Sequence, residues 1–209
     1  MWQSADGSDS ASDLPATDGK RFYSLALSPD GTAAVLVTGF GEGGFNLMLQ
    51  RIGSDTTTVP LVATAANEYA PRFSPDGHWL AYTSDESGRP EVYVRPFPGS
   101  GQRVQISTGG GYQAVWSGDS RHVFYRSGSV FMVADVVPSG STLSVAARRK
   151  LFEGNYFGAD PTGLSAAYDV TPDGHSLLVG RAIGDSADEI VVWTGWLGEL
   201  EQQFAEKRR

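Results

Sequence analysis

Short apolar stretches alternate with polar turns along most of the chain. In residues 68–108 the segments EYAPRFS, HWLAYTS, EVYVRPF and RVQIST are separated by SPDG, DESGRP and PGSGQ. Short runs rich in β-branched and aromatic residues, bounded by clusters of Gly, Pro, Asp and Ser, predict β-strands. This part of the chain is therefore expected to form four short antiparallel strands.

The same order of strands recurs around a four-residue turn. SPDG occupies 28–31 and 74–77, SGDS occupies 117–120 and TPDG occupies 171–174. A period in the forties indicates a repeat architecture. The strands that follow the turns, such as AAVLVTGF and HSLLVGRA, are apolar on both faces, which is typical of sheets covered on both sides.

These features predict an all-β fold, a β-propeller of four four-stranded antiparallel blades within residues 1–197. The expected blades cover about 20–64, 65–108, 109–152 and 160–197. The last unit supplies only three strands, so residues 12–18 are expected to add a closing strand from the N-terminus. Residues 198–209 are expected to form a short C-terminal helical tail. A closed four-bladed ring and part of a larger propeller both remain open.

The turn residues are interpreted as structural. Asp-Gly between two apolar strands favours a hairpin, because Gly accepts a positive φ and Asp bonds the nearby backbone. Equivalent positions of different blades lie apart, whereas catalytic groups must converge. We therefore expect four turn-forming aspartates and a looser third turn, where SGDS replaces SPDG. The aspartates are Asp30, Asp76, Asp119 and Asp173.

The first strand of each blade is the candidate binding element, because it lines the central channel of a propeller. Five residues before the Ser or Thr of each turn stand Tyr23, Tyr69, Tyr112 and Ala166. Two interpretations stay open: a ring that contacts a ligand at the channel mouth, or packing between blades with each hydroxyl at the wet edge. The polar residues near this ring are Lys20, Glu68, Arg72, Gln113, Asp160 and Asp169. The predicted ligand-binding residues are Tyr23, Tyr69, Arg72, Tyr112, Gln113 and Asp169.

Composition narrows the classes of partner. The 209 residues carry a formal net charge of −8, which argues against nucleic acid as a partner. There is no cysteine, so thiolate metal sites and disulfides are excluded. The three histidines, His78, His122 and His175, fall in three different units, so a shared metal site is not expected. The start MWQSADGSDSASD lacks the basic and apolar regions of a signal peptide, and the compartment stays unknown.

Two sets of residues carry a family resemblance. SPDGHWLAYTSDESGRPEVYVRPFPGSG resembles the WD-repeat-like propeller repeat with a Pro-Asp-Gly turn that occurs in TolB and in oligopeptidase-type proteins. QISTGGGYQAVWSGDSRHVFYRSGSVFMVADV and the ending EIVVWTGWLGELEQQF resemble the C-terminal propeller of bacterial transmembrane serine/threonine kinases. The resemblance implies a sensing module without a catalytic centre or cofactor. It implies an extracytoplasmic position if the module is attached to a membrane kinase, and a soluble cytoplasmic one otherwise.

Three functions are weighed. The first is a non-enzymatic propeller that binds a protein, a peptide or a small ligand, since the motifs G-x-S-x-G, H-R-D and D-F-G are absent. The second is a hydrolase or lyase with a channel metal, for which Glu68, Asp160 and Asp169 are the first carboxylates to examine. The third is a structural dimerisation domain, in which a homodimer completes a larger propeller.

Overall fold

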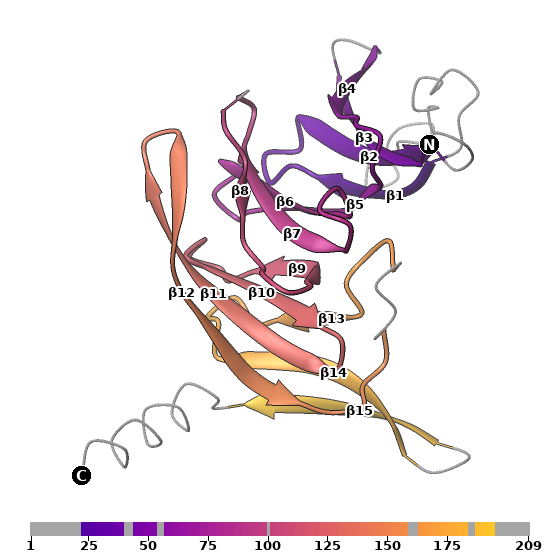
Figure 1. Ribbon diagram of the computed structural model, residues 1–209, viewed down its shortest axis with the longest axis vertical. Coiled ribbons are helices and arrows are strands. Elements are labelled where there is room, and N and C mark those ends of the chain that lie inside the picture. Colours follow the sequence, from indigo (N-terminus) through magenta and orange to yellow (C-terminus); the bar gives the residue numbers. More distant parts are fainter. Residues whose placement is uncertain are drawn as a thin grey trace, which may run out of the picture.

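A computed structural model of the chain describes residues 22–39, 44–53, 57–99, 101–158, 163–183 and 187–194. Within these ranges all regular elements are strands, and they form four antiparallel sheets that follow one another along the chain (Figure 1). The same ranges contain no helix that could span a bilayer. The prediction of an all-β fold of small antiparallel sheets is confirmed.

Each sheet is a simple meander in which neighbouring strands in sequence pair. The first sheet contains β1 (Phe22–Leu27), β2 (Ala33–Gly39), β3 (Phe45–Arg51) and β4 (Thr58–Val62). The second contains β5 (Glu68–Phe73), β6 (Trp79–Ser84), β7 (Glu91–Pro96) and β8 (Val104–Gln105). The third contains β9 (Tyr112–Trp116), β10 (His122–Ser127), β11 (Val130–Ser139) and β12 (Thr142–Glu153). The fourth contains β13 (Tyr168–Val170), β14 (Ser176–Ile183) and β15 (Ala187–Thr194).

Three apolar cores lie between successive sheets, because alternate residues of a strand point to opposite faces. In β6, Leu80 packs with Val35 of the first sheet, whereas Trp79 packs with Val123 of the third. A third core joins Phe124 to residues of the fourth sheet. Strands that are buried on both faces therefore explain the runs of apolar residues that follow the turns.

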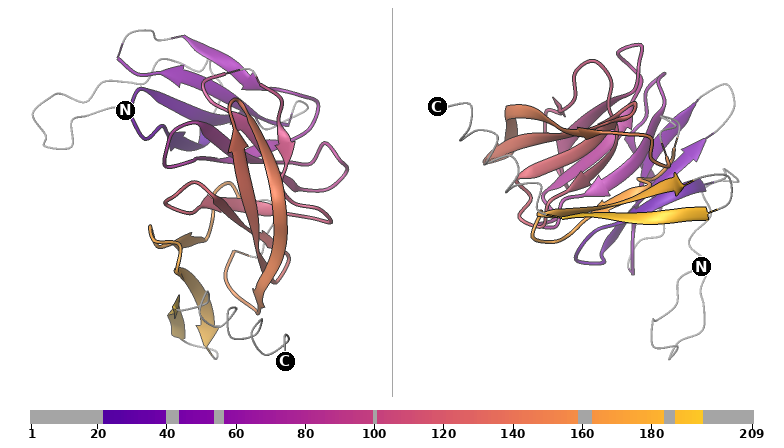
Figure 2. Two further views of the ribbon diagram at one scale, coloured as in Figure 1. Left: turned by 90° about the vertical axis from the view of Figure 1, so that its left-hand side faces the viewer. Right: turned by 90° about the horizontal axis from the view of Figure 1, so that it is seen from below.

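The first strands of the sheets lie side by side. β5 contacts both β1 and β9, and β9 also contacts β13 (Figures 1 and 2). The predicted closing strand at 12–18 and the predicted helical tail at 198–209 lie outside the described residues. The fourth sheet has three described strands, so the closure of the ring and the number of blades stay predictions.

The last strand of the second sheet is shorter than the expected 103–108. β8 ends at Gln105, because the Ser107 hydroxyl takes over as the acceptor for the Val92 amide at 2.7 Å. The Ile106 amide also donates to the Val92 carbonyl, and the Ile106 side chain is fully buried. The chain therefore turns inward here, which burial of one isoleucine stabilises.

The last hairpin of the third sheet is longer than expected. β11 and β12 stay paired as far as Ser139 and Thr142, so only Gly140 and Ser141 form the turn. The hairpin stands out from its own sheet and reaches along the second sheet (Figures 1 and 2). Leu143 from this extension joins the core between the second and third sheets. This apolar contact fixes the direction of the extension.

Candidate functional site

The four repeated turns share one hydrogen-bond pattern. In the second turn the Ser74 hydroxyl donates to Asp76 Oδ1, which also accepts the His78 amide at 3.0 Å. The Trp79 amide donates to Ser74 Oγ at 3.0 Å. The other three turns repeat these bonds with their own residues. The prediction that these aspartates form turns is confirmed.

These bonds lower the pKa of the Asp30 and Asp173 carboxyls. The hydroxyl of Ser28 lowers the pKa of Asp30, and the backbone and side chain of Thr32 add to this effect. The hydroxyl of Thr171 lowers the pKa of Asp173 in the same way. A carboxylate that accepts several hydrogen bonds is stabilised in its charged form. Asp30 and Asp173 are therefore ionised at neutral pH, and each carboxylate bonds groups of its own turn.

The third turn keeps this geometry although it lacks the usual Pro and Gly. A side chain at Gly118 would place its Cβ 2.0 Å from the carbonyl oxygen of Pro172 in the fourth turn. Ser120 takes the left-handed conformation with φ at 59°, where the other turns have Gly. Its hydroxyl accepts a hydrogen bond from the Asp76 amide of the second turn at 3.3 Å. The expected loosening is not seen, and the change in sequence follows from contacts with both neighbouring turns.

The first strands of all four sheets meet around residues 164–169. The Ser24 hydroxyl of β1 donates to the Leu164 carbonyl at 3.0 Å. The Tyr168 hydroxyl donates to the Gln113 carbonyl of β9 at 2.8 Å. A guanidinium nitrogen of Arg72 on β5 lies 3.9 Å from a carboxylate oxygen of Asp169. This segment, which we call the central segment, therefore touches each of the other three sheets.

Two of the three predicted tyrosines are buried. Tyr69 and Tyr112 belong to the inner residues of the second and third sheets. The Tyr112 hydroxyl donates to the Gly128 carbonyl at 3.1 Å. Tyr23 is 38% exposed, and its ring meets Phe45 edge-on at 5.4 Å between centroids. Burial favours the packing interpretation for Tyr69 and Tyr112, whereas Tyr23 keeps an exposed surface.

The predicted polar residues fall into two groups. The side chains of Arg72 and Asp169 are 47% and 67% exposed and lie beside each other. Gln113 is buried, has φ at 58°, and its side-chain oxygen has no partner among the described residues. Glu68 is fully buried, and its carboxylate accepts the Thr64 hydroxyl. Lys20 and Asp160 lie outside the described residues.

The burial of Glu68 has an electrostatic consequence. Removal from water raises the pKa of the Glu68 carboxyl, although the hydroxyl and amide of Thr64 act against this shift. The bond to Thr64 ties β5 to the linker that enters the second sheet. Glu68 therefore stabilises the fold from a buried position, whereas the Asp169 carboxylate is exposed to solvent.

The sequence patterns did not select two residues of this region, Tyr168 and Arg126. Tyr168 stands three residues before its turn instead of five, so a search at fixed spacing selected Ala166. Arg126 is fully buried and donates to the carbonyls of Gly128, Tyr156 and Phe157. Its guanidinium also lies 4.7 Å from the centroid of the Phe131 ring, and burial lowers its pKa. A lone arginine in an apolar strand was the available signal.

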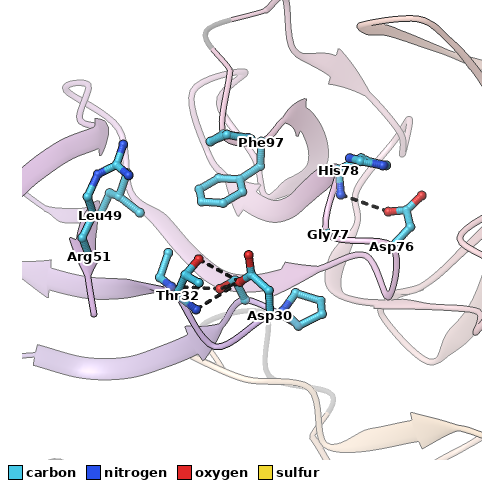
Figure 3. Close-up of a pocket in the computed structure, with 12 residues that line it drawn as sticks. Asp30, Thr32, Leu49, Arg51, Asp76, Gly77, His78 and Phe97 are labelled. Atoms are coloured by element: carbon cyan, nitrogen blue, oxygen red, sulfur yellow. Dashed lines mark hydrogen bonds between the residues drawn. The ribbon is translucent and has the colours of Figure 1, made fainter. Parts of the chain in front are cut away.

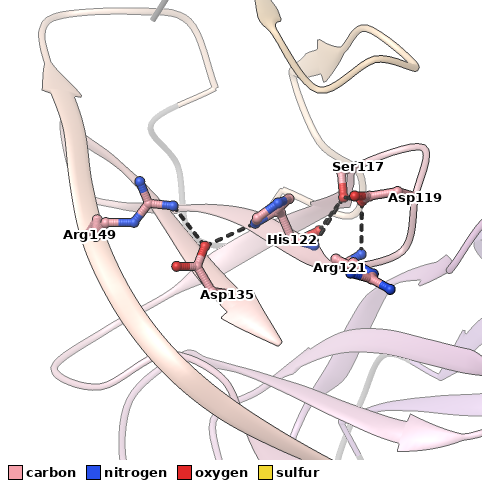
Figure 4. Close-up of polar contacts among 6 residues, drawn as sticks. All are labelled: Ser117, Asp119, Arg121, His122, Asp135 and Arg149. Carbon is pink, nitrogen blue, oxygen red and sulfur yellow. Dashed lines mark hydrogen bonds and ion pairs between the residues drawn. The ribbon is translucent and has the colours of Figure 1, made fainter. Parts of the chain in front are cut away.

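The face of the third sheet carries a polar cluster across three strands. Asp135 of β11 accepts from Arg149 of β12 at 2.7 Å and lies 2.9 Å from Nδ1 of His122 on β10 (Figure 4). His122 and Asp135 are direct partners in the register. Arg149 and Asp135 carry opposite charges, and such pairs across strands stabilise a sheet. The nearby Ser117 hydroxyl is already engaged with Asp119, so this cluster is interpreted as structural.

No group of three histidine and acidic side chains within the described ranges is arranged to hold a metal ion.

The chain was compared with known protein families and solved structures. No model of a protein family matches the chain.

Several solved structures resemble the chain. TolB from Acinetobacter baumannii is 19% identical with a TM-score of 0.58, and the match covers 84% of this chain and 41% of that one. A TolB-like protein from Agrobacterium tumefaciens is 21% identical with a TM-score of 0.57, covering 84% and 61%. Hydrazine synthase from Kuenenia stuttgartiensis is 14% identical with a TM-score of 0.53, covering 81% and 57%.

The chain thus spans about two fifths to three fifths of the length of the structures it resembles. At these identities the likeness concerns the course of the backbone. Four consecutive antiparallel sheets whose first strands are adjacent agree with the backbone of these propeller structures. The chain therefore has the fold of the TolB-like β-propellers.

Proposed function

We propose that the chain is a non-enzymatic β-propeller module that binds a protein or peptide where its first strands meet. The observation that carries this proposal is the convergence of all four sheets on the central segment. Around this segment Tyr23, Arg72 and Asp169 keep exposed side chains. An aromatic ring, a guanidinium and a carboxylate together suit the backbone and side chains of a peptide.

The exposed groups are available for recognition because the fold depends little on them. Arg72 and Asp169 are 3.9 Å apart and solvent-exposed, and such pairs contribute roughly 0–1 kcal/mol to stability. Their replacement is therefore expected to leave the fold intact. In contrast, Tyr69 and Tyr112 are part of the inner packing, and their replacement would report on folding.

Selection of a random peptide library on the immobilised chain tests this proposal. We expect that selected peptides lose about tenfold in affinity for Tyr23→Ala and for the pair Arg72→Ala with Asp169→Ala. Arg89→Ala, in the exposed loop between β6 and β7, serves as the matched control and should bind like the unchanged chain. Equal binding by all variants would place the peptide elsewhere and contradict the proposal.

We also propose a sensor role for the module in a bacterial signalling kinase. The resemblance of EIVVWTGWLGELEQQF and of the third unit to kinase-attached propellers supports this assignment. An upstream kinase domain and membrane helix in the same reading frame are expected. A coding context without them would contradict this assignment and leave the binding module untouched.

The metal-dependent hydrolase or lyase stays the alternative. Its candidate carboxylates Glu68 and Asp169 differ in environment, since one is buried on Thr64 and the other is exposed beside Arg72. Elemental analysis of the purified chain distinguishes the two functions. A tightly bound metal at one ion per chain would favour the alternative.

A further inference from the structure

A second surface lies at the other end of the first strands. Tyr23 stands near the start of β1, and the turn 28–31 follows its end. Five residues of extended chain separate Tyr23 from Ser28, a length of about 17 Å. Features of the turn side therefore lie far from Tyr23, whereas Arg72 and Asp169 stand only two residues before their own turns.

A cavity of about 330 Å³ opens between the turns of the first and second sheets. Its apolar wall comes from Pro29, Leu49 and Phe97, and the ring of Phe97 points into the cavity (Figure 3). Phe73 contacts this ring edge-on at 4.8 Å, which holds the ring in place. The volume lies within the range of small ligand sites and accepts one large apolar side chain.

A second cavity of about 350 Å³ lies between the second and third sheets on the same side. It shares Asp76, His78 and Phe97 with the first cavity and continues to the tip of the β11–β12 hairpin at Pro138. Two cavities with a common wall form an elongated groove across three sheets. We call this pair of cavities the turn-side groove. Its length suits an extended chain better than a compact small molecule.

The charges along the groove define the polarity of its occupant. Asp30 and Asp76 use one carboxylate oxygen, Oδ1, for their turns, and their second oxygens have no partner among the described residues. In Figure 3 one oxygen of Asp30 points toward the side where Phe97 lies. Arg51 stands at the far end of the groove, and its guanidinium has no hydrogen-bond or ion-pair partner among the described residues. Two carboxylates beside an apolar wall complement a basic residue next to an apolar one.

We propose that the turn-side groove binds an extended segment of a partner protein in which an apolar side chain adjoins lysine or arginine. The apolar side chain enters the cavity between Leu49 and Phe97. The neighbouring cation lies on the free carboxylate oxygens of Asp30 and Asp76. The net charge of −8 favours the approach of such a segment at low salt.

Fluorescence anisotropy with three labelled peptides tests this site on the full chain. The first peptide has phenylalanine between two lysines in a short Gly/Ser frame. In the second, alanine replaces phenylalanine, and in the third, glutamate replaces both lysines. We expect binding of the first peptide, at least tenfold weaker binding of the second and none of the third.

Matched variants locate the site. Asp76→Asn keeps a hydrogen-bond acceptor for the turn and should lower the affinity for the first peptide about threefold to fivefold. Asp173→Asn makes the same change in the equivalent turn outside the groove and should have no effect. Arg51→Glu should strengthen binding of the first peptide severalfold. Arg89→Glu changes the net charge by the same amount and should leave the affinity unchanged.

Two results would overturn the site. Equal effects of Asp76→Asn and Asp173→Asn would mean a general response to net charge. Equal affinity for the phenylalanine and alanine peptides would mean that the apolar cavity is not used. The Tyr23→Ala variant keeps the turn-side groove unchanged. This variant should therefore bind the first peptide with the same affinity as the unchanged chain. Loss of both sites together would point to unfolding, which circular dichroism detects.

Discussion

At the scale of single residues, the third turn shows how a repeat departs from its own motif. Gly118 replaces Pro because the Pro172 carbonyl of the next turn occupies the space of a side chain. Ser120 replaces Gly in a left-handed conformation, and its hydroxyl oxygen accepts a hydrogen bond from the Asp76 amide. A strained residue of this kind costs roughly 1–2 kcal/mol, which a contact between sheets offsets.

Gly118→Ala should destabilise the chain by about 1–3 kcal/mol, because the added methyl group overlaps the Pro172 carbonyl. Denaturant unfolding followed by circular dichroism measures the change. Gly99→Ala is the control, since its nearest neighbour would be Pro96 Cβ at 4.0 Å. Similar stabilities of the two variants would mean that the turns of the third and fourth sheets separate in solution.

At the scale of elements, buried carboxylates fasten the linkers between sheets. Glu68 holds Thr64 ahead of β5, and Glu91 accepts the Ser107 hydroxyl and the Gly110 amide after β8. Each carboxylate bonds backbone or hydroxyl groups that the strand pattern leaves without a ladder partner. These bonds hold the linkers in place, although the linkers contain little regular structure.

The raised pKa of Glu68 predicts a pH effect on stability. A carboxyl that binds its proton more tightly in the folded state contributes most at low pH, and this contribution falls as pH rises from the usual value of 4.5 through the folded pKa. The unfolding free energy of the unchanged chain minus that of Glu68→Gln should decrease over this window.

Glu153→Gln supplies a control of opposite sign. The Lys150 ammonium lowers the pKa of Glu153, so its contribution is present above pH 4.5 and is lost as pH falls through the folded value. Urea titrations at a series of pH values measure both differences. Parallel pH profiles for the two variants would contradict the burial of Glu68.

At the scale of the whole molecule, the first sheet leaves an apolar edge uncovered. Phe22, Leu25 and Leu27 of β1 are each about half exposed, whereas the corresponding strands β5 and β9 are largely buried. Exposed large apolar side chains that are grouped on one strand are typical of interaction sites. We propose that a second copy of the chain covers this edge and completes a larger propeller.

Light scattering should give twice the mass of 22.3 kDa for the unchanged chain. Leu25→Glu should shift the population to the single mass, because a charge in an apolar interface is not compensated. Val59→Glu is matched in exposure but lies on β4, at the opposite edge of the sheet, and should stay dimeric. A single mass for the unchanged chain would refute the dimer.

Much of the fold was predictable because its signals are local. The hydrogen bonds of a turn join residues at most five positions apart. The local sequence from Ser74 to Trp79 is therefore sufficient to predict the hairpin. The candidate site was predictable in part. Tyr23, Arg72 and Asp169 lie on the first strands β1, β5 and β13, and their binding of a ligand stays a prediction. The sequence left open whether Tyr69 is buried.

The sequence alone determined the strands, the turns and the order of the sheets, since alternation and turn chemistry act over a few residues. Only the tertiary structure decided which side chains meet, because those contacts join distant positions. Asp169 lies beside Arg72, and Leu164 bonds Ser24 across 140 positions. The turn-side groove likewise depends on sheets that are each defined locally but placed by the cores between them.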